Sequence, residues 1–258
     1  MKRILTFFAV LAGLAGLANA QDKAIDLNDF SLSKDDARIE THLHVAFPMY
    51  FGWSTLTNLN YKGAWNYTID APATVNSSPF LDTRTGKNFV YGLEMAALHF
   101  SKPGGMLDVS LGLRWTFMDF TLANSALTFR NQTPTSYNGN VKEFMPYPIK
   151  AEAANYDGRK SKIHANYLGI PLRLTLDCGK VKVFAGASAE YLISGYTKYK
   201  FPKYRQDATP MFNRFRATVE AGVQYGILGF YANYGLTTLF PDSLSDARTL
   251  TFGIVLGR

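Results

Sequence analysis

The chain has 258 residues, of which 47% are hydrophobic and 14% are aromatic, and its formal net charge is +7. After the first 20 residues it contains no run of about 18 apolar residues, which excludes membrane-spanning helices. The mean hydropathy of -0.08 and the high content of Phe, Tyr and Gly are typical of strands with one apolar and one polar face. A single cysteine, Cys178, excludes an internal disulfide framework.

The first 20 residues have the three parts of a secretory signal peptide. Lys2 and Arg3 form a positive start, an apolar run extends from residue 4 to 17, and Ala18-Asn19-Ala20 offers small residues for cleavage. The apolar run is shorter than the roughly 20 residues that a membrane-spanning helix needs. We therefore expect residues 1–20 to be removed, and residues 21–38, which are polar, to form a periplasmic tail. A plug that folds into the lumen is the alternative for this segment.

From residue 39 to 258 the chain repeats one unit about eight times, a stretch of roughly ten residues in which apolar side chains alternate with small or polar ones. In the stretch 88–100, for example, Tyr91, Leu93 and Met95 alternate with Gly92 and Glu94, and Ala97 is expected on the apolar face. Pro171 removes one ladder donor and predicts a local bulge or irregularity. The predicted strands are 39–53, 88–100, 106–120, 163–176, 180–193, 213–225, 228–239 and 248–258.

The connections between these strands alternate between long and short. Long connections at 54–87, 121–162, 194–212 and 241–247 are separated by short turns at 101–105, 177–180 and 226–227. Barrels of the outer membrane have this pattern, with the long loops outside the cell and the short turns in the periplasm. The sequence therefore predicts an all-β fold, an eight-stranded antiparallel up-and-down transmembrane β-barrel.

A water-soluble barrel with its apolar face inside is the alternative, because alternation alone does not say which face is inside. The leader, the bulky charged groups of the polar face and the aromatic residues near strand ends favour the membrane barrel. Tyr50, Phe51, Trp53, Phe117 and Phe120 are interpreted as such interfacial aromatic residues.

The second half of the chain contains several characteristic motifs, at 167–172, 183–186, 221–225, 234–237 and 250–257. They resemble the outer-membrane β-barrel domain family common in Bacteroidota, a group of small porin-like barrels. The resemblance implies a bacterial outer-membrane protein of about eight strands, inserted by the barrel-insertion machinery, and it supplies no catalytic residues. This chain ends on Arg258 where such barrels usually have an aromatic residue.

The polar face of the predicted barrel carries charged and imidazole side chains among glycines. Eight strands enclose a lumen that side chains can fill, so we expect a polar network in place of a wide pore. Glu94 and Arg114 lie on adjacent strands at nearly matching heights from the turn 101–105 and are expected to form an ion pair. The expected network consists of His42, His44, Glu94, Arg114, Arg173, Glu190, Arg216 and Glu220.

Motifs for catalysis or for metal binding are weak. His42 and His44 share one face of a strand, but two ligands make a weak metal site, and lumen filling is the favoured interpretation. His99 and His164 are expected at strand ends, too far away to join them. The chain has no G-x-S-x-G, H-E-x-x-H or phosphate-loop motif. We expect no enzymatic activity, no cofactor, no metal and no nucleic-acid partner.

Basic and aromatic residues are interleaved in the two longest outer connections after residue 120. Such mixtures suit the phosphates of lipopolysaccharide, surface glycans or another protein. The simpler alternative is a solvated loop whose charge complements the anionic lipid leaflet. In the second connection the basic residues are Arg130, Lys142, Lys150, Arg159, Lys160 and Lys162. The expected contact surface is Lys198, Tyr199, Lys200, Lys203, Tyr204 and Arg205 in the third connection.

The sequence thus predicts a small outer-membrane barrel with a structural or surface-interaction role carried by its loops. The expected partners are outer-membrane lipid and lipopolysaccharide, the insertion machinery, and a surface protein or glycan. A narrow solute or ion channel and a lipid-modifying enzyme are the alternatives from other functional classes.

Overall fold

The computed structural model of the protein describes residues 40–44, 47–63, 65, 80–101, 106–132, 143–151, 154–155, 160–200 and 203–257. The expected leader, the expected tail, most of the turn 101–105 and Arg258 lie outside these residues. Within the described part of the chain, no helix is long and apolar enough to cross a membrane.

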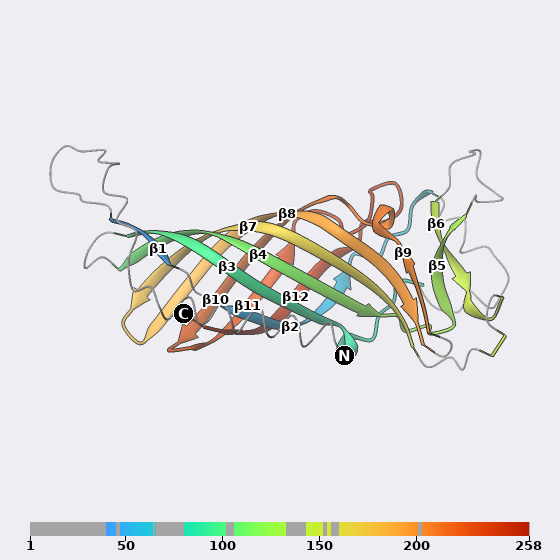
Figure 1. Cartoon of the computed structure of the whole chain (residues 1–258), viewed down its shortest axis with the longest axis horizontal. Coiled ribbons are helices and arrows are strands. Elements are labelled where there is room, and N and C mark those ends of the chain that lie inside the picture. Colours follow the sequence, from blue (N-terminus) through green and yellow to red (C-terminus); the bar gives the residue numbers. More distant parts are fainter. Residues whose placement is uncertain are drawn as a thin grey trace.

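Eight strands close into one antiparallel barrel (Figure 1). Neighbours along the ring are also neighbours in the chain, and the β2–β12 pair joins the first ring strand to the last. The eight predicted strands and the predicted fold class are thereby confirmed. The ring strands are β2 (Met49–Thr57), β3 (Phe89–Ser101), β4 (Leu107–Thr121), β7 (Ser161–Cys178), β8 (Val181–Tyr199), β10 (Phe215–Tyr225), β11 (Leu228–Gly235) and β12 (Arg248–Leu256).

The barrel wall has its apolar face outside and its polar face inside. On β7 the exposed outer side chains include Ile170, Leu172 and Leu174, whereas Tyr167 on the inner face is fully buried. The same pattern continues around the ring, where Phe215 and Phe230 are among the most exposed apolar residues. An apolar outer band is stable only against lipid, so the soluble alternative is excluded.

The predicted first strand is divided in two. β1 (Glu40–His44) and β2 both pair with β3, from Glu40↔Ser101 to His44↔Ala97 and from Met49↔Leu93 onward. Five steps from His44 to Met49 face four steps from Ala97 to Leu93, so the two pairings differ in register by one residue.

Extra residues at two further places shift the alternation of inner and outer faces. On β3, Glu94 pairs with Arg114 and Ala96 pairs with Leu113, so Met95 is unmatched. Beyond it, Ala97 and His99 share the face of Glu94, and the expected outward position of Ala97 is therefore wrong.

The second shift lies on β8, where Tyr167 pairs with Leu192 and Asn166 pairs with Ser194, leaving Ile193 unmatched. Pro171, where a bulge or irregularity was expected, causes no register shift. The pairs Leu111↔Leu172 and Arg114↔Gly169 keep one register on either side of a gap in the β4–β7 ladder.

The long connections contain regular structure that the sequence did not predict. β5 (Leu127–Gln132) and β6 (Glu143–Pro148) form a hairpin, and β9 (Tyr204–Asp207) pairs with the outer end of β8 (Figure 1). Short 3-10 turns are η2 (Thr85–Lys87), η3 (Ile149–Ala151) and η4 (Thr209–Met211). In Figure 1 these additions gather at one end of the barrel, opposite the short turns.

A hydrophobic cap fills this extracellular end. Trp65 is fully buried among Phe80, Phe129 and Phe240, with ring centroids 5.1–5.6 Å from its own. These residues come from three different connections, and the indole N–H of Trp65 donates to the Phe144 carbonyl at 2.6 Å. The main hydrophobic core among the described residues therefore includes the aromatic residues of the loops.

The cap also joins the connection after β2 to the connection before β12. Tyr61 forms an isolated bridge with Ser245, and the Lys62 backbone N–H donates to the Leu244 carbonyl at 2.8 Å. Lys62 Nζ lies 2.5 Å from Asp246 Oδ1. We call these contacts the outer clasp.

Candidate functional site

A buried ion network fills the middle of the lumen. Arg114 Nη2 lies 3.0 Å from Glu94 Oε2, as expected from the positions of the two residues, and Arg114 Nη1 lies 2.6 Å from Glu220 Oε2. Arg173 Nη2 lies 2.8 Å from Glu220 Oε1 and 3.2 Å from Glu94 Oε2. Two guanidiniums and two carboxylates thus balance one another inside the barrel, which is the condition for burying charge at acceptable cost.

Tyr50 belongs to this network and not to an interfacial aromatic girdle as the sequence suggested. Its side chain is buried, its hydroxyl donates to Glu94 Oε2 at 3.1 Å, and it accepts a hydrogen bond from Arg173. The Arg114 guanidinium lies over its ring, 4.3 Å from the centroid. Gly92 leaves room for the ring, because a Cβ there would lie 3.1 Å from the Tyr50 Cβ.

A second ion pair lies further toward the extracellular end. Arg216 and Glu190 are register partners on β10 and β8, with Nε 2.9 Å from Oε2, and the Arg216 guanidinium lies over the Tyr167 ring. Between the two clusters the lumen has a cavity of about 20 Å³, lined in part by Tyr50 and Arg216. That volume holds about one water molecule.

The predicted histidine pair lies near the periplasmic end of the wall. The register places His42 opposite His99 and His44 opposite Ala97, so the expected separation of His99 from the pair is wrong. The error arose because β1 pairs with the periplasmic end of β3. The structure describes the backbone but not the side chains of His42 and His44. His99 Nδ1 lies 2.9 Å from Asp108 Oδ1.

His164 lies at the opposite, extracellular end, on the register row of Asp119, as expected. Among the described side chains, no group of three His, Cys, Asp or Glu is arranged to hold a metal ion.

The β8–β9 hairpin carries the predicted contact surface, and its members fall into two groups. Lys200, Lys203 and Arg205 are exposed, and Lys198 is half-buried. Tyr199 is only 3% exposed and packs with Ile149, so its expected place on the contact surface is wrong. The sequence could not separate it from its neighbours, because the shift at Ile193 reverses the faces of this part of β8.

Tyr204 holds the hairpin against the β5–β6 hairpin. Its ring stacks on Tyr199 at 5.2 Å, and its hydroxyl accepts a hydrogen bond from Arg130. Arg130 also donates to Gln206 at 2.8 Å. The basic residues Lys142 and Arg159 of the second connection lie outside the described residues.

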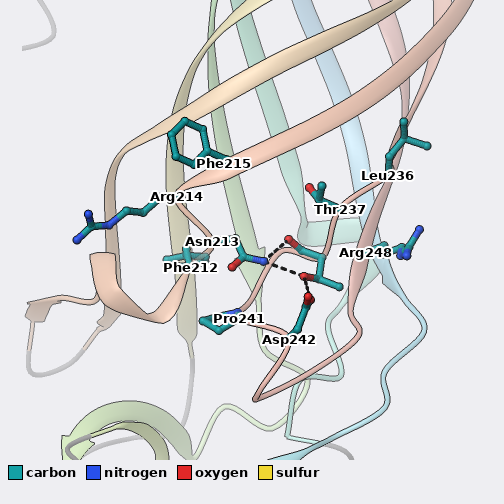
Figure 2. A pocket seen from close by; sticks show the side chains of 10 residues that line it. Phe212, Asn213, Arg214, Phe215, Leu236, Thr237, Pro241, Asp242 and Arg248 are labelled. Atoms are coloured by element: carbon teal, nitrogen blue, oxygen red, sulfur yellow. Dashed lines mark hydrogen bonds between the residues drawn. The ribbon is translucent and has the colours of Figure 1, made fainter.

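An open groove of about 660 Å³ lies on another part of the extracellular end, between the start of β10 and the connection before β12. Figure 2 shows Arg214 and Arg248 on opposite sides of Asn213 and Asp242. Asn213 Nδ2 donates to the Thr238 hydroxyl at 2.8 Å, and that hydroxyl donates to Asp242 Oδ1 at 2.7 Å (Figure 2). These bonds fix the turn, and a carboxylate stands between the two guanidiniums.

A closed ring of eight antiparallel strands with a lipid-compatible exterior and a filled polar lumen defines an outer-membrane β-barrel. The family model described as outer membrane protein beta-barrel domain matches residues 99–241. This is more than half of the chain, which therefore belongs to that family. The protein is located in the bacterial outer membrane.

Two solved outer-membrane barrels are similar to this chain at low sequence identity. Neisserial surface protein A (NspA) is 8% identical, with a TM-score of 0.37, and the match covers 83% of this chain and 97% of that one. Ail, the attachment invasion locus protein of Yersinia pestis, is 9% identical, with a TM-score of 0.32 and the same two coverages. No curated protein sequence matches the chain.

Proposed function

We propose that this protein is a non-conducting outer-membrane barrel that binds anionic partners at its extracellular surface, through the β8–β9 hairpin. The observation that carries the proposal is a contrast between two sets of charges. Those of the lumen are buried and paired with one another, whereas Lys200, Lys203 and Arg205 on the hairpin are exposed. Exposed cations on a fixed scaffold are available to a ligand, and buried, neutralised ones are not.

The filled interior supports a role outside the lumen. A solute that entered from outside would first meet the cap around Trp65 and then the two ion clusters, where the remaining cavity is about 20 Å³. Opening such a path requires the loss of packed aromatic contacts and of buried ion pairs, each of which is costly.

The hairpin has the rigidity that a binding surface needs. β9 pairs with β8 over Tyr196–Tyr199, and Tyr199 and Tyr204 anchor the pair to neighbouring connections. Preformed surfaces lose less conformational entropy when they bind. Sulfated or phosphorylated glycans, lipid headgroups and acidic protein segments all have the charge that this surface accepts.

A charge-reversal variant tests the proposal. Changing Lys198, Lys200, Lys203 and Arg205 to Glu is expected to weaken binding to immobilised dextran sulfate at least about tenfold, or about 1.4 kcal/mol. The matched control changes the same number of extracellular cations elsewhere, Arg84, Lys87, Lys150 and Arg214, to Glu. Equal weakening in both variants would show that binding follows net charge and would overturn the proposal. Folding of each variant is checked by heat-modifiable migration on gels.

A further inference from the structure

Three cations stand side by side across three strands on the outer wall of the barrel. The register pairs Lys162 of β7 with Lys198 of β8, and Lys198 with Arg205 of β9. Like charges directly opposite one another on neighbouring strands destabilise a sheet. Further out, the Lys200 N–H donates to the Lys160 carbonyl at 3.3 Å, which places two more cations beside these three. We call the five residues, Lys160, Lys162, Lys198, Lys200 and Arg205, the cation row.

The acids nearby neutralise only part of this charge. Asp119 Oδ2 lies 2.8 Å from Lys162 Nζ, and Asp119 Oδ1 lies 2.6 Å from His164 Nδ1 and 3.7 Å from Lys198 Nζ. Asp207, opposite Tyr196 in the register, accepts two bonds from Thr209. Five cationic side chains against two carboxylates leave an excess of three positive charges, without counting His164.

Mutual repulsion within the cation row is visible at Lys160. Burial, followed by repulsion from Lys162 and Lys200, holds the pKa of Lys160 below its ordinary value of 10.5. An anion bound in the row would relieve this repulsion.

The cation row lies directly outside the apolar band of the same wall. The outward positions of β7 run from Lys162 and His164 through Asn166 to Leu168 and Ile170, so the wall changes from basic to apolar within one strand. On β4 the outward neighbours of Asp119 are aromatic, Phe117 and then Trp115, which stack at 5.1 Å. Aromatic residues of this kind mark the level of lipid headgroups.

The side chains of the row are held in place on rigid strands. The Arg205 guanidinium lies 3.7 Å from the centroid of the Tyr196 ring, and the His164 ring stacks on the Tyr196 ring with 4.3 Å between centroids. Ile193 is an extra residue in β8, so Tyr196 and Lys198 share the outer face with Tyr191, which unbroken alternation would place on the opposite face. The register shift at Ile193 therefore affects which face both the cation row and the β8–β9 hairpin present.

We propose that the cation row binds the phosphate groups of an outer-leaflet glycolipid, the lipid A part of lipopolysaccharide, whose acyl chains lie on the apolar wall below. The proposal rests on the proposed function, since it names the anionic partner of the lower part of the same surface. The position of the row favours a lipid, because a phosphate at this height stands above chains that contact Ile170 and Ile193, which are 53% and 50% exposed.

The test measures binding of the full-length protein, purified in neutral detergent, to three probes. These are bisphosphorylated lipid A, lipid A from which both phosphates have been removed, and inorganic phosphate at the same concentration. The variant changes Lys160, Lys198 and Arg205 to Ala, and leaves Lys162 intact because it is buried against Asp119. The control changes Arg84, Lys87 and Arg214 to Ala. A second variant, Arg205→Ala alone, alters one exposed side chain and keeps the test available if the triple variant does not fold.

We expect the wild type and the control to bind bisphosphorylated lipid A at least about tenfold more tightly than the triple variant. We expect Arg205→Ala to lie between them, and dephosphorylated lipid A and inorganic phosphate to bind weakly to all. Equal affinity of the wild type for lipid A with and without phosphates would overturn the lipid site. So would unchanged lipid A binding in the triple variant, or, where the triple variant does not fold, in Arg205→Ala. If dextran sulfate binding still depends on the hairpin in either case, the proposed function survives without this inference.

Discussion

Glu220 shows how far each charge in the lumen depends on the others. It accepts hydrogen bonds from Arg114 and from Arg173, and its side chain is almost completely removed from solvent. Glu94 also accepts from both guanidiniums, so the set is balanced only as long as all four members are present. A buried charge that loses its partner keeps the cost of desolvation and loses the compensating attraction.

We predict that Glu220→Gln lowers the free energy of unfolding by about 3–5 kcal/mol, the usual cost of breaking a buried pair. The measurement is a urea titration of the barrel in lipid vesicles, followed by tryptophan fluorescence. Combining Glu220→Gln with Arg114→Met removes one charge of each sign and leaves Arg173 with Glu94. The double variant is expected to lose less stability than the single one, and an equal or greater loss would contradict a balanced network.

The members of this network differ in how readily the sequence identifies them. Glu94 and Arg114 could be paired in advance because they lie at nearly matching heights from one short turn. Tyr50 could not, because an aromatic residue near a strand end is also what an interfacial girdle contains. The alternation of the strand could have identified Tyr50 as an inward residue, because Tyr50 and Gly52 alternate with the outward Phe51 and Trp53.

At the level of elements, Met95 and Ile193 decide which faces the far parts of β3 and β8 present. Alternation predicts a face correctly only while the register is unbroken, so the eight strands were predictable and the faces beyond these two residues were not. The β5–β6 hairpin escaped prediction for a different reason. Pro146 and Pro148 stand within β6, and proline is typical of loops and edge strands.

Deleting Thr197, which lies in a regular part of β8, is expected to turn Lys198 from the outer face to the inner one, against the cap. We predict that this deletion abolishes the folded band on unboiled gels, because a cation is forced into an apolar core. Deleting Ile193 is the matched control, since Leu192 and Ser194 then face Tyr167 and Asn166 without an extra residue and Lys198 stays outside. A Thr197 deletion variant that folds and binds dextran sulfate like the wild type would show that the alternation of faces has no such role.

In the whole molecule, two structures block the passage of solutes along the barrel axis, the hydrophobic cap and the ion network. They differ in chemistry, and removing one leaves the other in place. The expectation of a filled lumen could be drawn from strand number, because eight strands leave little room inside. The cap could not, because its aromatic residues come from three connections far apart in sequence and form no local pattern.

We predict that the purified protein shows no steady conductance in planar lipid bilayers, and that Trp65→Ala, which removes the centre of the cap, remains closed because the ion network is intact. Single-channel recording at both polarities measures this. Stable, ion-selective openings of the wild type would favour the channel alternative and contradict the non-conducting barrel.

The outer clasp lies over the seam at which the first and last strands of the ring meet. Within the bilayer this seam is held by the β2–β12 ladder, and outside it by the Tyr61–Ser245 bridge and the Lys62–Asp246 ion pair. The two ends of the clasp follow β2 and precede β12 in the chain, so its contacts lie beside the pairing of the first and last ring strands. For β2 and β12 to separate laterally in the membrane, the contacts of the outer clasp must break as well as the hydrogen bonds of the β2–β12 ladder.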